Sequence, residues 1–143
     1  MAINVLGSVY VAKYASVAMA ATNKDESESG LILFTSSVAA EEGQRNSAGY
    51  SASKGAINGL VMPMARDLGR YKIRVAAIAP GIFDTPMYRA MPKKMQAGFD
   101  LVTPMKRLGR PEEFAQAVKF CIENGYINGV SLRIDGATKL SHL

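Results

Sequence analysis

Tyr50 and Lys54 stand four residues apart in the stretch Tyr-Ser-Ala-Ser-Lys, and Ser37 precedes Tyr50 by 13 residues. On a helix, a spacing of four puts both side chains on one face. A tyrosine hydroxyl ordinarily ionises near pH 10, and a neighbouring ammonium favours the phenolate, with an attraction of roughly 4 kcal/mol at about 4 Å. The pair could therefore serve as a general acid and base. Taken alone, it could equally be two surface residues that share a helix face.

Two short apolar runs place further polar groups near this pair. Leu31–Thr35 and Ile73–Ala79 are bounded by turn residues, a pattern typical of strands buried on both faces. Ser37 follows the first run, and the turn Pro80-Gly81 ends the second. In open α/β sheets, ligands bind beyond the carboxyl ends of the strands, where a serine hydroxyl can stabilise a developing alkoxide. Each feature alone is also explained by an ordinary turn.

Helical segments alternate with these strands. Such alternation predicts right-handed crossovers and a parallel sheet covered on both faces, so the predicted fold class is α/β, in one domain spanning residues 1–143. The expected helices are a largely buried one at Ala2–Ala21, then Gly49–Leu68, a short one at Lys93–Phe99, and Pro111–Glu123; Gly129–Asp135 is the last strand, and Ser36–Ala48 and Ile82–Gly109 are irregular.

Composition narrows the functional classes. The chain has 48% apolar residues and a formal charge of +5, but its basic residues are scattered without interleaved aromatics, which disfavours nucleic-acid binding. An anionic substrate tail, such as a CoA phosphate, suits the mild basic excess. The single Cys121 excludes an internal disulfide and fits a reducing compartment. We find no signal peptide and expect no membrane span, so we expect an intracellular protein.

Taken together, these features resemble the C-terminal half of the short-chain dehydrogenase/reductase family. The resemblance covers essentially the whole chain. The stretches between the motifs, notably Ser37–Gln44 and Pro63–Leu68, are most similar to the type 2 3-hydroxyacyl-CoA (17β-hydroxysteroid) dehydrogenases. The matching segments are Ile3–Gly7, Ser37, Tyr50–Lys54, Arg66–Leu68, Ile73–Val75, Ala79–Met87, Arg107–Glu113 and Gly129–Gly136.

The resemblance implies a role for each matching residue. Tyr50 would exchange a proton with the substrate, Lys54 would assist it and bond the nicotinamide ribose, and Ser37 would orient the substrate oxygen. Asn4 would anchor a water in a proton relay to Lys54. No residue is assigned to a metal. The nicotinamide end of the cofactor would lie on Tyr50, Lys54, Pro80, Gly81, Phe83 and Thr85, and the substrate on Ser37, Val38, Gln44 and Tyr50.

The resemblance further implies NAD as the cofactor, with NADP as the alternative, and a hydroxyacyl-CoA or a hydroxysteroid as the small-molecule substrate. A mitochondrial location follows from the subgroup, with the cytoplasm as the alternative. A homo-oligomer would form through the helices at Asn4–Ala21 and Gly49–Leu68. Two other functions stay open, a 3-oxoacyl-carrier-protein reductase and a non-catalytic structural or interaction subunit.

Family members are much longer, and this sequence lacks their glycine-rich pyrophosphate-binding turn. It also lacks the strand that would lie beside Leu31–Thr35, whose N–H and C=O groups would then be unpaired along one edge. We expect that the chain does not fold stably alone, and that the other half of the domain or a partner chain completes the sheet.

Overall fold

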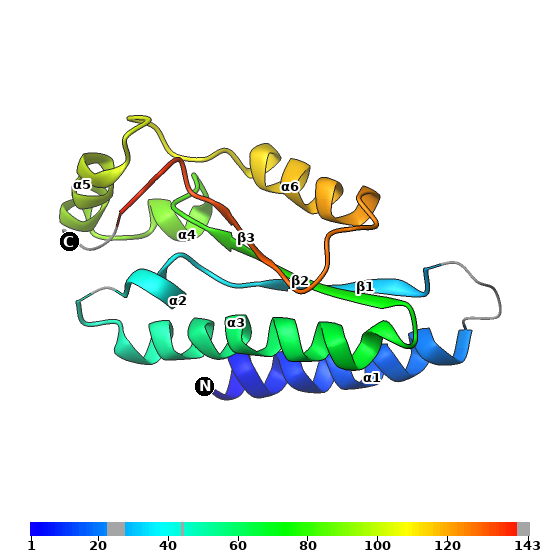
Figure 1. Cartoon of the computed structure of the whole chain (residues 1–143). Coiled ribbons are helices and arrows are strands. Elements are labelled where there is room, and N and C mark those ends of the chain that lie inside the picture. Colours follow the sequence, from blue (N-terminus) through cyan, green and yellow to red (C-terminus); the bar gives the residue numbers. More distant parts are fainter. Residues whose placement is uncertain (23–27, 44, 140–143) are drawn as a thin grey trace.

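The computed structural model describes residues 1–22, 28–43 and 45–139. Its centre is a parallel sheet in the order β1 (Gly30–Thr35), β2 (Ile73–Pro80) and β3 (Ser131–Ile134). Helices cover both faces of the sheet (Figure 1). The predicted α/β class is confirmed.

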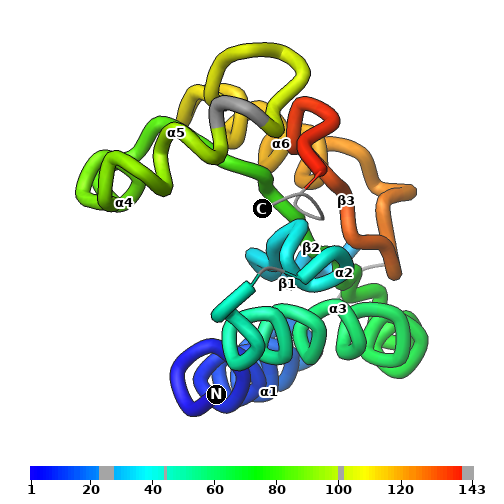
Figure 2. Tube along the Cα trace, turned by 90° about the vertical axis from the view of Figure 1, so that its left-hand side faces the viewer, coloured from blue at the N-terminus to red at the C-terminus, as the bar shows by residue number. Residues whose placement is uncertain are grey.

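The helices form two layers around this sheet. On one face lie α3 and α1, the latter continuing a π-helical segment, η1; on the other lie α6 and, near the carboxyl ends of the strands, α4 and α5 (Figure 2). Short α2 follows β1. The bounds are η1 Ala2–Gly7, α1 Ser8–Thr22, α2 Ala39–Glu42, α3 Ala48–Gly69, α4 Pro86–Arg89, α5 Lys93–Val102 and α6 Pro111–Glu123.

The main core lies between α3 and the sheet. Buried residues recur on α3 at every fourth position, which keeps them on one helix face. They pack against the inward-facing residues of β1 and β2, and this packing fixes the position of the amino-terminal end of α3 under the end of β1. The cluster consists of Ala12, Ile32, Phe34, Ile57, Val61, Ala65, Ile73, Val75 and Ala77.

Arg74 holds α6 on the opposite face of the sheet. It lies on β2 with only 6% of its surface exposed, and its guanidinium forms a bidentate pair with Glu28. The remaining donors reach backbone oxygens at the carboxyl end of α6 and just beyond it, namely those of Cys121, Ile122 and Ile127, at 2.8–3.1 Å. A buried charge is tolerated because every donor direction is used.

Two segments predicted as irregular contain helices. The loop expected at Ser36–Ala48 contains α2, and the segment Ile82–Gly109 contains α4 as well as α5, which is longer than expected. Thr85 caps α4, since its side chain accepts a hydrogen bond from the Tyr88 N–H, and Pro86 occupies the first turn. Such single-turn helices are set by caps and tertiary packing, so they carry no periodic apolar pattern.

The expected burial of the first helix is wrong. Ala12 is the one buried residue of α1, and apolar side chains of η1 and α1 are widely exposed. The helix contacts the rest of the domain through one side. Ala12 packs in the core, and the Asn4 side chain donates to the Ser53 hydroxyl of α3 at 3.1 Å. The exposed set is Ile3, Leu6, Tyr10, Val11, Tyr14 and Val17.

By length and composition alone, the helix Ala2–Thr22 could also cross a membrane. One helix of this kind is weak grounds for a span, since a helix of a soluble domain passes the same test. Because this helix contacts the core and α3, we interpret it as a helix of the folded domain.

Strand β1 is buried less than its sequence predicts. Ile32 and Phe34 are buried, whereas Leu31 and Leu33 are half-buried. Within the described residues, β1 pairs with β2 alone, so its other edge offers free backbone groups. A second neighbouring strand along the free edge of β1 would bring the burial of the strand to the predicted level.

Replacing Arg74 by Met should destabilise the natural protein by about 3–5 kcal/mol, because the carbonyl oxygens at the end of α6 and the Glu28 carboxylate lose a shared buried partner. Urea unfolding measures the loss. Glu123→Gln, which breaks an exposed pair with Lys119, is the control and should change stability by less than about 1 kcal/mol. Equal stability of the two variants would contradict this role of Arg74.

Candidate active site

Ser37 lies at the carboxyl edge of the sheet, as predicted. The Ser36 N–H donates to the Ile78 carbonyl oxygen at 2.7 Å, and the Val38 N–H donates to that of Pro80 at 3.2 Å. These two bonds continue the β1–β2 ladder past the formal end of β1 and hold Ser37 between the strand ends. The residue is buried, with 8% of its surface exposed.

The hydrogen bonding of Ser37 leaves its proton available. Its Oγ accepts a hydrogen bond from the Ala39 N–H at 3.1 Å. A hydroxyl has one donor in addition to its acceptor sites, so the Ser37 O–H can still donate to a bound oxygen. That is the capacity needed to orient a carbonyl or stabilise an alkoxide.

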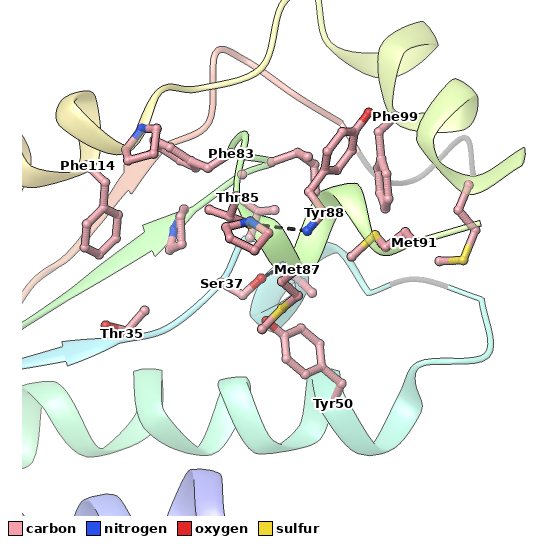
Figure 3. Close-up of a pocket in the computed structure, with 18 residues that line it drawn as sticks. Thr35, Ser37, Tyr50, Phe83, Thr85, Met87, Tyr88, Met91, Phe99 and Phe114 are labelled. Carbon is pink, nitrogen blue, oxygen red and sulfur yellow. Dashed lines mark hydrogen bonds between the residues drawn. The ribbon is translucent and has the colours of Figure 1, made fainter. Parts of the chain in front are cut away.

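Tyr50 and Lys54 project from the first turns of α3. The Lys54 ammonium lies 5.8 Å from the centroid of the Tyr50 ring and donates to the Thr35 carbonyl oxygen at 2.8 Å. The helical spacing thus brings the pair together, and the last residue of β1 anchors the lysine. Tyr50 is 47% exposed, and its hydroxyl points from α3 toward the segment that carries Ser37 (Figure 3).

Burial lowers the pKa of the Lys54 ammonium below its ordinary value of 10.5, because desolvation penalises the charged form. A proton on Lys54 is therefore held less tightly than on a solvated lysine. This suits a group that is to donate hydrogen bonds and pass a proton in the same site.

Ser37 and Tyr50 border a cavity of about 710 Å³ between α2, the ends of β1 and β2, and the α4–α5 segment. Figure 3 shows its lining side chains. Its volume lies in the range of small-molecule sites, and its walls are mostly apolar with a few polar groups at one end. The predicted residues Val38, Pro80, Gly81, Phe83 and Thr85 also line it.

Aromatic and methionine side chains make up the apolar wall. Phe83 meets Phe114 of α6 edge to face, with ring centroids 6.0 Å apart, and Tyr88 packs against Phe99 at 6.5 Å. Sequence reasoning missed Phe114, because its apolar neighbours on α6 predict a core position as readily as a pocket wall. Three methionines, Met87, Met91 and Met95, complete this side.

Two glycines allow close packing beside the cavity. A Cβ at Gly81 would lie 2.8 Å from the Cα of Asp135, and one at Gly109 would lie 2.6 Å from the Phe83 ring. Only glycine fits at either position without a shift. Gly81 thus lets the end of β2 run directly beside β3, and Gly109 leaves room for the Phe83 ring.

The predicted site residues divide between two hollows. Asn4 and Lys54 line a second hollow of about 580 Å³ between α1 and β1, whereas Ser37 and Tyr50 line the first; Thr35 borders both. Asn4 bonds Ser53, whose hydroxyl donates to the Tyr50 carbonyl oxygen at 2.7 Å. Asn4 is thereby linked to the tyrosine turn of α3. Gln44 lies outside the described residues.

The strand-end residues fit one end of a nicotinamide cofactor. Gly81 and Thr85 line the main cavity, and Lys54 lines the second hollow on the other side of Thr35. Within the described ranges, no glycine-rich turn joins a strand to a helix in the manner of a pyrophosphate cradle.

Comparison with known proteins gives the same family. The sequence model of a family described as "Enoyl-(Acyl carrier protein) reductase" matches residues 1–138. The mouse (Mus musculus) protein named 3-hydroxyacyl-CoA dehydrogenase type-2 is 41% identical over 96% of the chain and 54% of its own length. A 3-oxoacyl-(acyl-carrier-protein) reductase of Mycobacterium bovis is 33% identical over 97% and 55%.

A solved structure agrees in fold. The 3-hydroxyacyl-CoA dehydrogenase type-2 of Mycobacterium avium superposes with a TM-score of 0.90 at 39% identity, covering 96% of this chain and 54% of that one. The chain belongs to the short-chain dehydrogenase/reductase family. It spans about half the length of the curated relatives it matches, and the match falls on their C-terminal part.

Titration of Lys54 should show a midpoint below 10.5 in the folded protein, since burial disfavours its charge. NMR of ¹³C-labelled lysines measures it, with the signal assigned by its absence in Lys54→Met. In urea, the titration midpoint of the same Lys54 signal should return to the ordinary lysine value. The folded form should gain stability as the pH rises through this window, because the unfolded chain then binds more protons. A folded midpoint at or above 10.5 would contradict this burial effect.

Proposed function

We propose that these residues form the catalytic half of a nicotinamide-dependent oxidoreductase that interconverts a secondary alcohol and a ketone. The observation that carries the proposal is the convergence of Ser37 and Tyr50 on one cavity, with Lys54 bound to the end of β1 beside them. The family membership agrees with it.

Each of the three side chains has a distinct part in the reaction. The Ser37 hydroxyl, which accepts from Ala39, donates to the substrate oxygen and orients it. Tyr50 gives a proton to that oxygen during reduction, or takes it during oxidation. The Lys54 ammonium, fixed on Thr35, stabilises a negative charge on the tyrosine. When bound, the cofactor supplies or accepts the hydride.

The cofactor would lie with its nicotinamide end on Pro80, Gly81, Phe83 and Thr85, and its ribose within reach of Lys54. We propose NAD rather than NADP, on the likeness to the type-2 3-hydroxyacyl-CoA dehydrogenases. A mitochondrial location is proposed on the same likeness, and fractionation of the source cells tests it. The part of the domain that selects the adenosine ribose belongs to the other half.

The cavity favours an acyl chain as the apolar part of the substrate. Its volume of about 710 Å³ and its unbranched, flexible methionine walls suit a chain of variable length better than one rigid ring system. We therefore propose a 3-hydroxyacyl-CoA as the substrate and keep a hydroxysteroid as the second choice. A reductase acting on an acyl-carrier protein would use the same residues, as the name of the Mycobacterium bovis relative suggests.

Two exposed surfaces are proposed to bind other polypeptide segments. The free edge of β1 and the hollow beside it are the proposed seat of the other half of the domain, or of a chain that supplies it. The exposed apolar side chains of α1, including Val11 and Val17, are proposed to pair with a second copy. A non-catalytic subunit would need these surfaces but not the serine, tyrosine and lysine arrangement.

Tyr50→Phe should lower turnover of 3-hydroxybutyryl-CoA with NAD by at least about a hundredfold in the natural protein, because the proton-transfer group is removed. Steady-state kinetics by NADH absorbance measures it. Tyr126→Phe, at a residue 97% exposed, is the control and should keep full activity. Undiminished turnover in Tyr50→Phe would exclude the proposed chemistry.

The 143-residue chain produced alone should not unfold as a soluble, cooperative monomer, because β1 keeps an unpaired edge beside an apolar hollow. Urea melts with sedimentation velocity test this. Co-expression with the amino-terminal half of the domain should restore a cooperative transition. A cooperative monomer of the chain alone would refute the completion model.

A further inference from the structure

Arg133 joins three carboxylates beyond the end of the central strand. It lies on β3, and its guanidinium donates to Glu42 at 2.7 Å, to Glu41 at 3.1 Å and to Asp135 through two nitrogens. Glu42 and Asp135 are nearly buried, with 11% and 12% of their side chains exposed. Arg133 thus connects the edge strand β3 to α2, which follows the opposite edge strand, β1.

The glutamates hold the turn that carries Ser37. The N–H groups of Glu41 and Glu42 both donate to the Val38 carbonyl oxygen, at 3.2 and 3.1 Å, and the Ala39 N–H of the same turn donates to the Ser37 Oγ. Because α2 has only four residues, it has little intrinsic stability. Its position therefore depends on outside contacts such as Arg133.

Asp135 is linked to the α5 wall of the cavity through two threonines. Its backbone oxygen accepts from both the N–H and the hydroxyl of Thr138, and the Thr138 hydroxyl oxygen lies 3.2 Å from that of Thr103. Thr103 in turn donates to the carbonyl oxygen of Phe99, which lines the cavity from α5. Both threonines are buried, with 4% and 1% of their surfaces exposed.

We propose that Arg133 is a positioning residue for the reaction at Ser37: it ties the α2 turn to the Asp135–Thr138 turn, and so sets the spacing of the two cavity walls. This inference rests on the proposed function. A guanidinium offers five donors spread over three nitrogens and so reaches carboxylates on separate segments, whereas a lysine ammonium would have to reach all of them from one atom. Removing it takes away the guanidinium from Asp135 and leaves Glu42 with weaker contacts such as the exposed Lys139 ammonium at 3.3 Å, so the tie between the two turns is loosened.

A purely structural ion pair would have a different effect. It would lower stability, but at a temperature far below unfolding it would leave the chemistry of the folded fraction unchanged. A positioning residue alters the orientation of Ser37, and hence kcat, in protein that is still folded. The two cases are separated by kinetics together with hydrogen exchange of the α2 amides.

The test compares Arg133→Met, Arg133→Lys and the control Lys119→Met, which breaks an exposed pair on α6. In the natural protein, Arg133→Met should lower kcat for 3-hydroxybutyryl-CoA with NAD by about tenfold to a hundredfold, with a smaller change in KM. Arg133→Lys should recover part of this loss, since it keeps one charge. Hydrogen-exchange mass spectrometry should show faster exchange in the peptide that spans α2 and unchanged exchange in α3.

Each outcome bears on the proposal. An Arg133→Met protein that melts earlier but keeps its kcat and its α2 exchange would overturn it, as would an equal kcat loss in Lys119→Met. If Arg133→Met does not fold, the milder single variants Arg133→Lys and Glu42→Gln are used instead. Their kcat and the exchange of their α2 peptide supply the same two readouts. If the wild-type protein does not turn over 3-hydroxybutyryl-CoA with NAD, the proposed function fails separately, and unchanged α2 exchange in Arg133→Met would still refute the positioning role.

Discussion

The buried central strand β2 is the constraint on which the rest of the molecule depends. It pairs in parallel with β1 on one side and β3 on the other, so all three strands end at the same edge. Its side chains face α3 on one surface and α6 on the other, and Arg74 is the charged residue of the strand, held by Glu28 and by backbone oxygens near the end of α6. Shifting β2 by one residue would turn its core face outward and separate the strand ends that form the site.

The site is built around the last residue of β1. The Thr35 carbonyl oxygen receives the Lys54 ammonium, and Thr35 itself borders both hollows. The lysine therefore lies between the place where the substrate would be held and the edge where the sheet stays open. One hydrogen bond thus joins the proposed catalytic lysine to the strand that has an unpaired edge among the described residues.

The features that depend on neighbouring residues in the sequence could be predicted from it. The helical spacing of Tyr50 and Lys54 and the two apolar strands β1 and β2 depend on local geometry, and the structure contains them, with β1 less buried than predicted. The α2 turn and the Phe114 wall depend on contacts between distant segments, whereas α4 begins at a local cap, Thr85-Pro86, that is too short a signal to predict a helix. The exposure of α1 was mispredicted for a related reason, because an apolar helix composition does not reveal what covers the helix.

The contact between Gly109 and Phe83 has a consequence for the diversification of such enzymes. Any side chain at position 109 meets the Phe83 ring, which also lines the main cavity. A single codon change far from the reacting groups would therefore narrow the cavity while leaving the serine, tyrosine and lysine in place. Natural selection could tune the size of the accepted molecule at this position without altering the catalytic apparatus.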